Sequence, residues 1–474
     1  MVFSSSLFIF AFLPLLLFLY FIAKDSARNY VLLFFSLVFY AWGGPKFLFV
    51  MLGVVSIDYL MAIAIDYGIK VKKDNLSRLA LLFAVISNIG LLGYYKYTKF
   101  FLLNLNKLFD TSLRIPDIIM PIGISFFTFQ ALSYVIDVYK KDVKAQKNYF
   151  FVLLYVSLFP QLVAGPIVRY STVEKEIVRR NMSLEDISIG LERFILGFAK
   201  KIILANKLGE LADQIYDGHQ LFTATIWIAA VAYMLQIYFD FSAYSDMAIG
   251  LGRIFGFHFN ENFDFPYISK SITEFWRRWH ISLSTWFRDY IYIPLGGNRC
   301  SKSRWLFNLF IVWLITGMWH GAAWNFILWG LYYYCFLILE KIILGKYLKK
   351  LPAAIQHFYA LFIIFIGWII FRVESISQII RVLQVMFSNN ITTTSLDMAK
   401  IYIWKYGIYI VMGLLLSAPI YKWSKRRIYR FVNNRIFCYY VAVVVKYIFL
   451  LALFYVSVLF LINSTYNPFI YFRF

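Results

Sequence analysis

The sequence has few charged residues for its length. Asp, Glu, Lys and Arg make up 15% of the 474 residues, whereas hydrophobic residues make up 61% and aromatic residues 21%. A soluble protein carries about 25% charged residues, and a water-exposed fold of this size could not bury so much apolar surface. The composition therefore excludes soluble globular, disordered and disulfide-scaffold proteins, and it indicates that lipid is the main solvent of the chain.

Cysteine and several common catalytic patterns are also scarce. The three cysteines, Cys300, Cys335 and Cys438, lie far apart and form no CxxC pair, so neither a disulfide framework nor a zinc site is indicated. No HExxH, GxSxG, Walker A or GxGxxG pattern occurs in the context that its chemistry requires. We therefore expect no bound metal and no bound cofactor.

The net charge is strongly positive. The chain has 47 basic and 25 acidic residues, which gives +22 at pH 7. In a soluble protein this balance would suggest nucleic acid as a partner. Here the cations cluster in short loops between apolar runs, as they do in the cytoplasmic loops of membrane proteins, so we expect a lipid bilayer and no nucleic acid. The cytoplasmic clusters are 70–78, 140–147, 341–350 and 422–430.

Long apolar runs occur along the whole chain. A spanning helix needs about 20 mostly apolar residues, and some of these runs are short or broken, so we expect about 10–12 transmembrane helices in an all-α polytopic membrane protein. The runs lie at 7–23, 29–43, 47–67, 80–95, 117–138, 149–170, 189–206, 223–243, 305–318, 321–340, 356–372, 403–421 and 436–462.

The run at 149–170 carries Pro160, Gly165 and Pro166, which break helices. Non-helical backbone at membrane depth needs shelter from lipid, so we expect a re-entrant segment that enters and leaves on one side. With this segment the basic clusters give a consistent topology. The topology predicts a multi-pass protein of the cell (inner or cytoplasmic) membrane whose N- and C-termini are both extracytoplasmic.

We expect one membrane domain, 1–474, because no polar part is large enough to fold alone. The polar, Thr-rich stretch 388–400 is the most loop-like. Within the domain, we distinguish the N-terminal helices (1–138), a re-entrant and cytoplasm-facing polar region (139–304), the later helices (305–462) and an aromatic tail (463–474).

The stretch 238–304 mixes many charged residues with many aromatic ones. In one interpretation it lies at the membrane surface, where its tryptophans form an aromatic belt. In the other it is a folded, cytoplasm-facing floor whose arginines bind the phosphates of an anionic ligand. Composition alone does not decide between them. The tryptophans are Trp276, Trp279 and Trp286, and the arginines are Arg277, Arg278 and Arg288.

His320 lies between two apolar runs with no charged residue nearby. An ionisable residue at membrane depth is costly and usually faces an interior cavity, so it indicates function. A neutral imidazole, with an ordinary pKa of about 6.5, can act as general base for a hydroxyl that attacks an activated ester. Asn325 is close enough in sequence to be a candidate for stabilising the oxyanion. The alternative is a histidine that only packs or bonds a carbonyl.

Two further features are candidates for function. His280 is a second ionisable candidate, although its arginine neighbours favour an interfacial position. The segment 467–474 is rich in aromatic residues and follows a spanning run directly. From the residues alone, this tail is most simply an interfacial anchor. In the alternative it folds back into the protein and brings the Tyr471 phenol near the reaction centre.

These patterns together resemble the membrane-bound O-acyltransferase superfamily, and most closely its alginate O-acetyltransferase branch. The resemblance covers nearly the whole chain, with several long motifs in the order of the family. The motifs are SLVFYAW (36–42), PIGISFF (121–127), QLVAGPI (161–167), FDFSAYSDMA (239–248), EFWRRWHISLS (274–284), RDYIYIPLGG (288–297) and WHG (319–321).

The resemblance implies a funnel-shaped bundle around a thin membrane centre, with a central tunnel that links the two faces. It implies that His320 is the catalytic histidine and that His280 is the second histidine linked to activity. The implied reaction is O-acetylation of an exported polysaccharide, alginate or another surface glycan. The donor would be a cytoplasmic thioester, acetyl-CoA, and an extracytoplasmic SGNH-type acetyltransferase partner would complete the transfer.

The resemblance also changes the interpretation of the tail. Similar tails in this branch, or in a small partner chain of the D-alanylation branch, are thought to carry an acylated tyrosine outward, which favours Tyr471 as an acyl relay. One alternative function is D-alanyl transfer to teichoic acid from a carrier protein. The others are a polytopic transporter that transfers no acyl group and a non-catalytic export scaffold.

Overall fold

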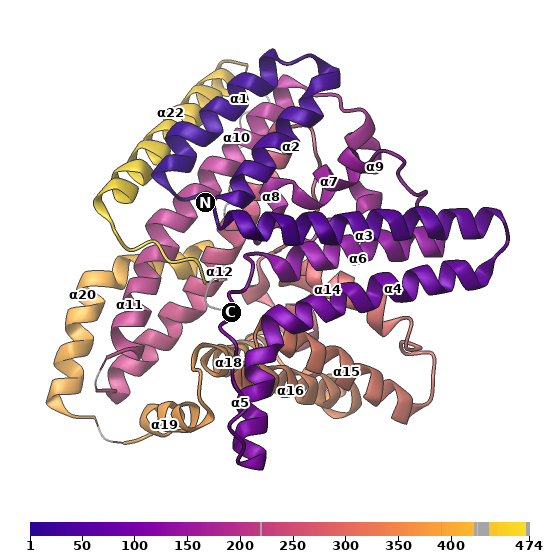
Figure 1. Cartoon of the computed structure of the whole chain (residues 1–474). Coiled ribbons are helices and arrows are strands. Elements are labelled where there is room, and N and C mark those ends of the chain that lie inside the picture. The colour runs from indigo at the N-terminus through magenta and orange to yellow at the C-terminus, as the bar shows by residue number, and fades with distance from the viewer. Residues whose placement is uncertain (219, 390, 421–423, 425–435, 471–474) are drawn as a thin grey trace. The chain divides into compact units, whose positions relative to one another are not determined.

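The computed structural model describes every residue except 219, 390, 421–423, 425–435 and 471–474 (Figure 1). Tyr471 and the basic residues of the predicted cluster 422–430 therefore lie outside the described residues. Within the described part of the chain all regular structure is helical, and no strand occurs there. The expected all-α fold is confirmed.

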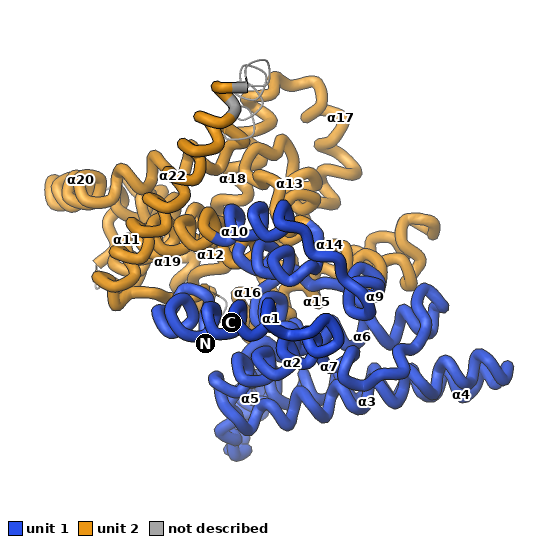
Figure 2. The backbone as a smooth tube through the Cα atoms, turned by 90° about the horizontal axis from the view of Figure 1, so that it is seen from above, with its two compact units in different colours: residues 1–194, 247–260 blue, residues 195–246, 261–474 orange. Residues whose placement is uncertain are grey.

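The helices group into two compact units (Figure 2). The first consists of residues 1–194 and 247–260, and the second of residues 195–246 and 261–474. The boundary between them crosses the predicted region 139–304, and the division of one domain into four parts stays a prediction.

The first unit holds the N-terminal elements. They are η1 (Phe8–Phe12), α1 (Leu13–Ile22), α2 (Asp25–Ala41), α3 (Pro45–Lys70), α4 (Asp74–Leu92), η2 (Gly93–Tyr97), α5 (Thr98–Phe109), α6 (Ile124–Lys140), α7 (Tyr149–Ser157), α8 (Phe159–Leu162), α9 (Tyr170–Val178) and the start of α10 (Leu184–Ala199).

The second unit holds the end of α10, most of α12 and the remaining elements. They are η3 (Lys200–Ala205), α11 (Asn206–Tyr216), α12 (Thr223–Ile254), η4 (Pro266–Ile268), α13 (Ile272–Arg278), α14 (Ile281–Phe287), η5 (Arg288–Tyr292), α15 (Lys302–His320), α16 (Trp324–Leu339), η6 (Glu340–Leu344), α17 (Gly345–Leu348), α18 (Ala353–Arg372), α19 (Ile376–Met386), α20 (Thr393–Leu416) and α22 (Ile436–Asn463).

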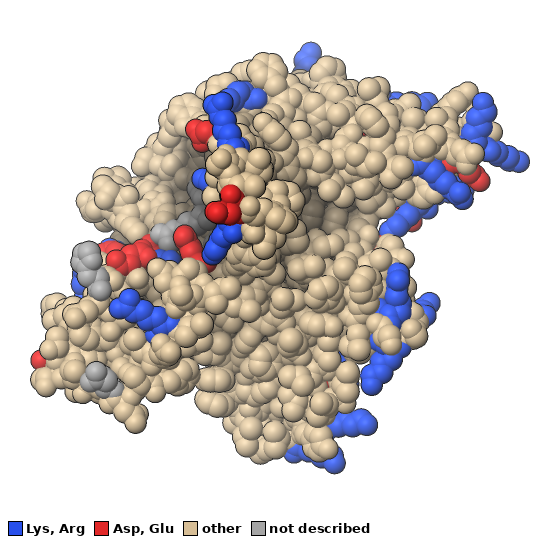
Figure 3. Space-filling view, turned by 60° about the horizontal axis from the view of Figure 1, so that its bottom comes forward, with Lys and Arg blue, Asp and Glu red and all other residues tan. Residues whose placement is uncertain are grey.

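Seven helical stretches in the described residues are long and apolar enough to cross a membrane. This number is below the expected 10–12 because several apolar runs form helices that are too short or too polar over their length. The face in Figure 3 is mostly uncharged, with Lys, Arg, Asp and Glu gathered in small groups. The protein is therefore a multi-pass membrane protein. The candidate spans are Pro45–Lys70, Asp74–Phe109, Thr223–Ile254, Trp324–Leu348, Ala353–Arg372, Thr393–Leu416 and Tyr440–Asn463.

The predicted break in 149–170 is confirmed. Helix α7 ends at Ser157, Leu158 leaves the helical region with φ −54° and ψ 111°, and α8 restarts with a proline in its first turn. Neither helix is long enough to span a bilayer. Almost the whole segment is buried, as non-helical backbone at membrane depth requires. The side on which the segment enters and leaves stays a prediction.

The expectation of a loop over 388–400 is wrong for its second half, because α20 already begins at Thr393. The Thr392 side chain accepts a hydrogen bond from Ser395 N at 3.2 Å and caps the helix. Threonine is a favourable N-cap residue, so the polar composition here marks a helix start as well as a turn.

Two glycines bring α15 and α16 into close contact in the second unit. A Cβ atom on Gly317 would lie 2.4 Å from Phe326 O, and one on Gly330 would lie 2.4 Å from Trp313 O. Small residues at a membrane helix crossing allow the backbones to approach in this way. The crossing holds the end of α15, where His320 lies, against the start of α16, where Asn325 lies.

Candidate active site

His320 is the last residue of α15 and is 7% exposed. Its ring packs edge-on against three aromatic rings, with centroid distances of 5.0 Å to Trp319, 5.0 Å to Trp329 and 5.2 Å to Phe371. Gly321 then leaves the helix in extended conformation. The structure thus places the predicted histidine inside the second unit, at a helix end.

His280 separates α13 from α14 and is 2% exposed. Its backbone has φ 43°, in the left-handed region that non-glycine residues rarely adopt. Such a conformation persists only where the surroundings impose it, and it is common at functional sites. The ring is enclosed by the second unit, and the predicted interfacial depth of this residue in the membrane stays a prediction.

Asn262, which the sequence analysis did not single out, fixes the ring of His280. Its Oδ1 lies 3.1 Å from His280 Nδ1 and also accepts hydrogen bonds from Ser282 N at 3.2 Å and Ser282 Oγ at 2.9 Å. Its carbonyl accepts from Ile281 N at 2.9 Å. Because the Ser282 N–H identifies the amide oxygen, Nδ1 of the neutral histidine carries the proton and Nε2 carries the lone pair.

The two histidines share a neighbour. The Trp319 ring lies 5.9 Å from the ring of His280 and 5.0 Å from that of His320. Burial, and secondly the charge of His320 when protonated, hold the pKa of His280 well below its ordinary value. His280 is therefore neutral at physiological pH. Its Nε2 is buried and makes no hydrogen bond within the described residues, so it can accept one from a substrate.

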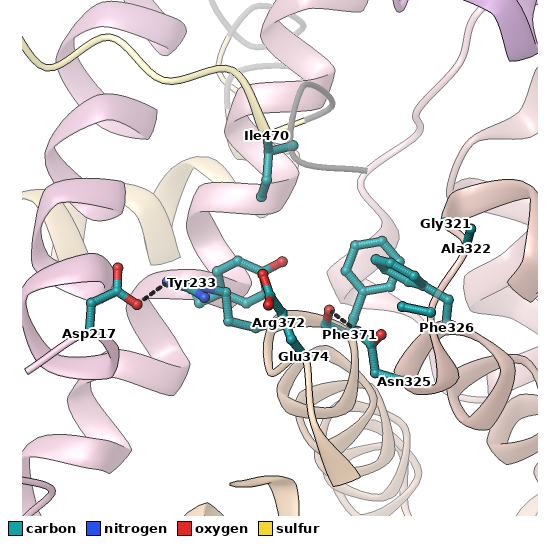
Figure 4. Close-up of a pocket in the computed structure, with 11 residues that line it drawn as sticks. Asp217, Tyr233, Gly321, Ala322, Asn325, Phe326, Phe371, Arg372, Glu374 and Ile470 are labelled. Carbon is teal, nitrogen blue, oxygen red and sulfur yellow. Dashed lines mark hydrogen bonds and ion pairs between the residues drawn. The ribbon is translucent and has the colours of Figure 1, made fainter. Parts of the chain in front are cut away.

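A cavity of about 620 Å³ lies in the second unit, where the residues after α15 and the end of α18 line it (Figure 4). Gly321, Ala322, Ala323 and Phe371 are among its lining residues, so His320 lies directly behind its wall. Asn325 also lines it, is 1% exposed and donates a hydrogen bond from Nδ2 to Phe371 O at 3.1 Å. This bond ties α16 to the end of α18, and the role of Asn325 toward an oxyanion stays a prediction.

The other side of the cavity is charged. Arg372 pairs with Asp213 at 3.0 Å and with Asp217 at 2.9 Å, and Glu374 lines the cavity nearby. The guanidinium also lies over the Tyr216 ring, 5.4 Å from its centroid. Sequence analysis missed this group, although a charged residue at the end of an apolar run is a visible signal. The cavity can therefore accommodate polar molecules.

The three predicted phosphate-binding arginines differ in their surroundings. Arg278 forms ion pairs with Asp264 at 2.9 Å and Glu274 at 3.0 Å, and Arg288 pairs with Asp289 at 2.6 Å. Arg277 is exposed and forms no ion pair within the described residues. Of the three, Arg277 offers a free guanidinium for an anion, and the role of all three toward phosphate stays a prediction.

The alternative of a membrane-surface tryptophan belt is wrong. Trp279 is 3% exposed and Trp286 is 4% exposed. Trp276 packs edge-on against Trp313 at 4.9 Å and Tyr333 at 4.8 Å. Trp279 also packs against Trp368 at 4.7 Å, so Trp276 and Trp279 belong to an aromatic cluster inside the second unit.

Glu340 orients α13, which precedes His280. Its carboxylate is 5% exposed and accepts hydrogen bonds from Ile272 N at 2.5 Å, Thr273 N at 2.9 Å and Thr273 Oγ1 at 2.7 Å. A carboxylate at a helix N-terminus satisfies backbone donors that have no partner in the helix. Glu340 thus connects the end of α16 to the segment that carries His280.

The tail folds back into the second unit instead of anchoring at an interface. Phe469 is 6% exposed and Ile470 is 3% exposed, and Ile470 lines the cavity. The interpretation of an interfacial anchor is therefore wrong for the described part of the tail. Tyr471 itself lies outside the described residues, and its role stays a prediction.

The fold and the site together define a polytopic membrane enzyme with two buried histidines, one of which, His320, packs against the lining of a polar cavity. The membrane-bound O-acyltransferase family matches residues 143–377. The chain is 41% identical to the "Probable alginate O-acetylase AlgI" of Pseudomonas aeruginosa, over 82% of this chain and 75% of that protein. It is 36% identical to the protein of the same name in Pseudomonas putida, over 100% of both chains.

The similarity extends to proteins with other names. The chain is 35% identical to the "Peptidoglycan O-acetyltransferase" of Helicobacter pylori, over 82% of this chain and 80% of that protein. It is 30% identical to the "Teichoic acid D-alanyltransferase" of Bacillus subtilis, over 49% of this chain and 62% of that protein. The chain belongs to the membrane-bound O-acyltransferase family and is an acyltransferase.

Proposed function

We propose that the protein is a membrane O-acetyltransferase that moves acetyl groups from cytoplasmic acetyl-CoA across the cell membrane for O-acetylation of an exported polysaccharide. An extracytoplasmic SGNH-type acetyltransferase receives the acetyl group and completes the transfer. The observation that carries the proposal is the cavity beside His320, in a chain similar over most of its length to alginate and peptidoglycan O-acetylases.

The chemical step requires a base next to an activated ester. A ring nitrogen of neutral His320 accepts the proton of the attacking hydroxyl, and the oxygen adds to the thioester carbonyl. The C–S bond then breaks, and CoA leaves as a thiol with the proton returned from the imidazolium. The new ester holds the acetyl group. His280 supplies a hydrogen-bond acceptor at Nε2, and Asn325 donates to the oxyanion.

The donor binds on the cytoplasmic side. Arg277 binds a phosphate of CoA through its exposed guanidinium, and Arg278 and Arg288, which already pair with carboxylates, contribute less. Only the acetyl group crosses the membrane, so neither CoA nor the polymer enters lipid. The proposed reaction requires no bound cofactor.

Tyr471 is the first acceptor of the acetyl group in this proposal. Ile470, the residue before it, lines the same cavity as Asn325. A phenol ester at Tyr471 carries the acetyl group to the extracytoplasmic side, where the C-terminus lies in our topology. There it meets the hydroxyl of the SGNH-type partner.

The test uses proteoliposomes loaded on the donor side with radiolabelled acetyl-CoA. His320→Ala should abolish label transfer, while its melting temperature in detergent stays close to that of the parent. His357→Gln is the matched control, because His357 belongs to the same unit and its ring bonds Ser269 O at 3.1 Å. Transfer at the parent rate by His320→Ala would refute the base assignment.

A second candidate is D-alanyl transfer to teichoic acid, which the similarity to the Bacillus subtilis protein favours. The same vesicles supplied with a D-alanyl carrier thioester distinguish the two donors. Counterflow of substrate without acyl transfer would instead indicate a transporter. Mass spectrometry of surface glycan from a deletion strain then shows which acetyl esters disappear and identifies the polymer.

A further inference from the structure

A buried ion pair lies inside the second unit, away from the histidines in sequence. Lys201 Nζ lies 2.6 Å from Asp240 Oδ1, and the two side chains are 3% and 2% exposed. Lys201 belongs to the π-helical segment η3, and Asp240 lies within the spanning helix α12. Two charges in such a place are costly unless their remaining hydrogen-bonding groups are also satisfied.

Main-chain groups of the tail satisfy the remaining hydrogen-bonding groups of Lys201 and Asp240. Lys201 Nζ donates to the carbonyl of Pro468, and Asp240 Oδ2 accepts from the backbone N–H of Ile470 at 2.8 Å. The pair therefore binds one carbonyl and one amide, two residues apart, of the same segment. We call Lys201 and Asp240 the tail clamp.

Neighbouring contacts extend the binding surface along the tail. Asn206 Nδ2 donates to Asn467 Oδ1 at 3.2 Å, and the Tyr466 hydroxyl donates to Asp213 Oδ2 at 2.5 Å. The Phe469 ring lies 4.9 Å from that of Tyr244. Asp213 also pairs with Arg372 at the cavity, so the tail contacts the charged side of the cavity as well as its lining.

We propose that the tail clamp is a binding site for the backbone of residues 468–470, and that it holds the tail at the cavity that Ile470 lines. Lys201 and Asp240 are positioning residues, since they act through the tail. The inference rests on the proposed function for the role of the tail in acetyl transfer, but the docking of the tail does not depend on the proposed function.

Recognition of the backbone gives a sharp test. Proline has a carbonyl but no N–H. Pro468 can therefore accept a hydrogen bond from Lys201, whereas a proline at position 470 cannot donate one to Asp240. Ile470→Pro should therefore release the tail, while Ile470→Val keeps the N–H and serves as the matched control. In a second variant, Lys201→Met/Asp240→Leu replaces the ion pair with apolar side chains, a change that a buried pair often tolerates without loss of folding.

The measurement is the mobility of a spin label at position 468 (Pro468→Cys), a change that keeps the main-chain carbonyl bound by Lys201, in proteoliposomes with the three native cysteines replaced by alanine. We expect a mobile label and loss of acetyl transfer in Ile470→Pro and in the double apolar variant. The label should stay immobile, and transfer should persist, in Ile470→Val. The same result, an immobile label and persisting transfer, is expected in Lys207→Met/Glu210→Gln, which removes another ion pair of this unit.

The outcomes separate the two proposals. An immobile label in Ile470→Pro and in the double variant overturns the tail clamp, whatever happens to acetyl transfer. A mobile label with transfer at the parent rate supports the tail clamp and refutes the relay through Tyr471. Thermal melting of each variant in detergent establishes that the label reports a folded protein.

Discussion

The side-chain oxygen of Asn262 lies 3.1 Å from Nδ1 of His280 and holds the ring in one tautomer. Because the bonded nitrogen carries the proton, the lone pair of Nε2 points to the side not occupied by Asn262. A residue 18 positions earlier in the sequence therefore decides which nitrogen of this histidine can accept a proton or a hydrogen bond.

The first prediction concerns Asn262→Asp. A carboxylate at this position still accepts from Nδ1–H, but its negative charge stabilises the imidazolium and raises the pKa of His280. The acid limb of the pH–rate profile for acetyl transfer should move to higher pH. Ser282→Ala, which leaves the Asn262 oxygen on Nδ1, should keep the limb in place. Unchanged profiles in both variants would contradict an essential neutral His280.

The second prediction is a loss of stability in acid. Burial lowers the pKa of His280 below that of the unfolded chain, which is about 6.5, so the unfolded state binds more protons below this pH. The stability that neutral His280 contributes is present above pH 6.5 and is lost as the pH falls below it. Melting temperatures in detergent between pH 8 and pH 5 should fall less steeply for His280→Asn than for the parent.

The third prediction concerns the crossing of α15 and α16. Gly330→Ala places a methyl group against the Trp313 carbonyl, and such overpacking should lower the free energy of unfolding by about 1–3 kcal/mol. Gly407→Ala on α20 is the control, because its Cβ would meet only Ile403 Cγ2 at an ordinary 3.5 Å. Chemical denaturation of both variants tests this. Equal free energies of unfolding for the two variants would contradict a contribution of the close crossing to stability.

The fourth prediction tests the cavity. Ala322→Trp fills part of the space beside His320 and should strongly reduce acetyl transfer without loss of the folded protein. Ala353→Trp, at an exposed position at the start of α18, adds the same side chain outside the cavity and should leave the rate unchanged. Binding of acetyl-CoA, measured by thermal shift, should persist in both. Normal transfer by Ala322→Trp would mean that the reaction does not use this cavity.

Much of the fold could be predicted from the sequence, because apolar runs in a membrane protein coincide with helices. The helices that carry His320 and Asn325 fall where the runs at 305–318 and 321–340 predict them. The break between α7 and α8 was also visible from the nearby Pro160, since proline removes a backbone donor and favours the first turn of a helix. The short helices α13 and α14 could not be predicted, because their tryptophans and arginines occur equally in interfacial segments.

The candidate site was harder to predict, since its partners are distant in sequence. Arg278 pairs with Glu274 one helical turn away, a spacing that the sequence displays. The contact between Asn262 and His280, and the bonds from Glu340 to α13, depend on how loops and helices fold together. No local periodicity encodes such contacts.

The left-handed backbone of His280 bears on how that residue should be mutated. Glycine and asparagine adopt φ 43° readily, but alanine and β-branched residues resist it. An alanine scan through this motif would therefore combine a lost imidazole with a distorted connection between two short helices. An asparagine replacement isolates the ring chemistry, and a comparison of the glycine with the alanine replacement, which both lack the ring, measures the cost of the backbone geometry.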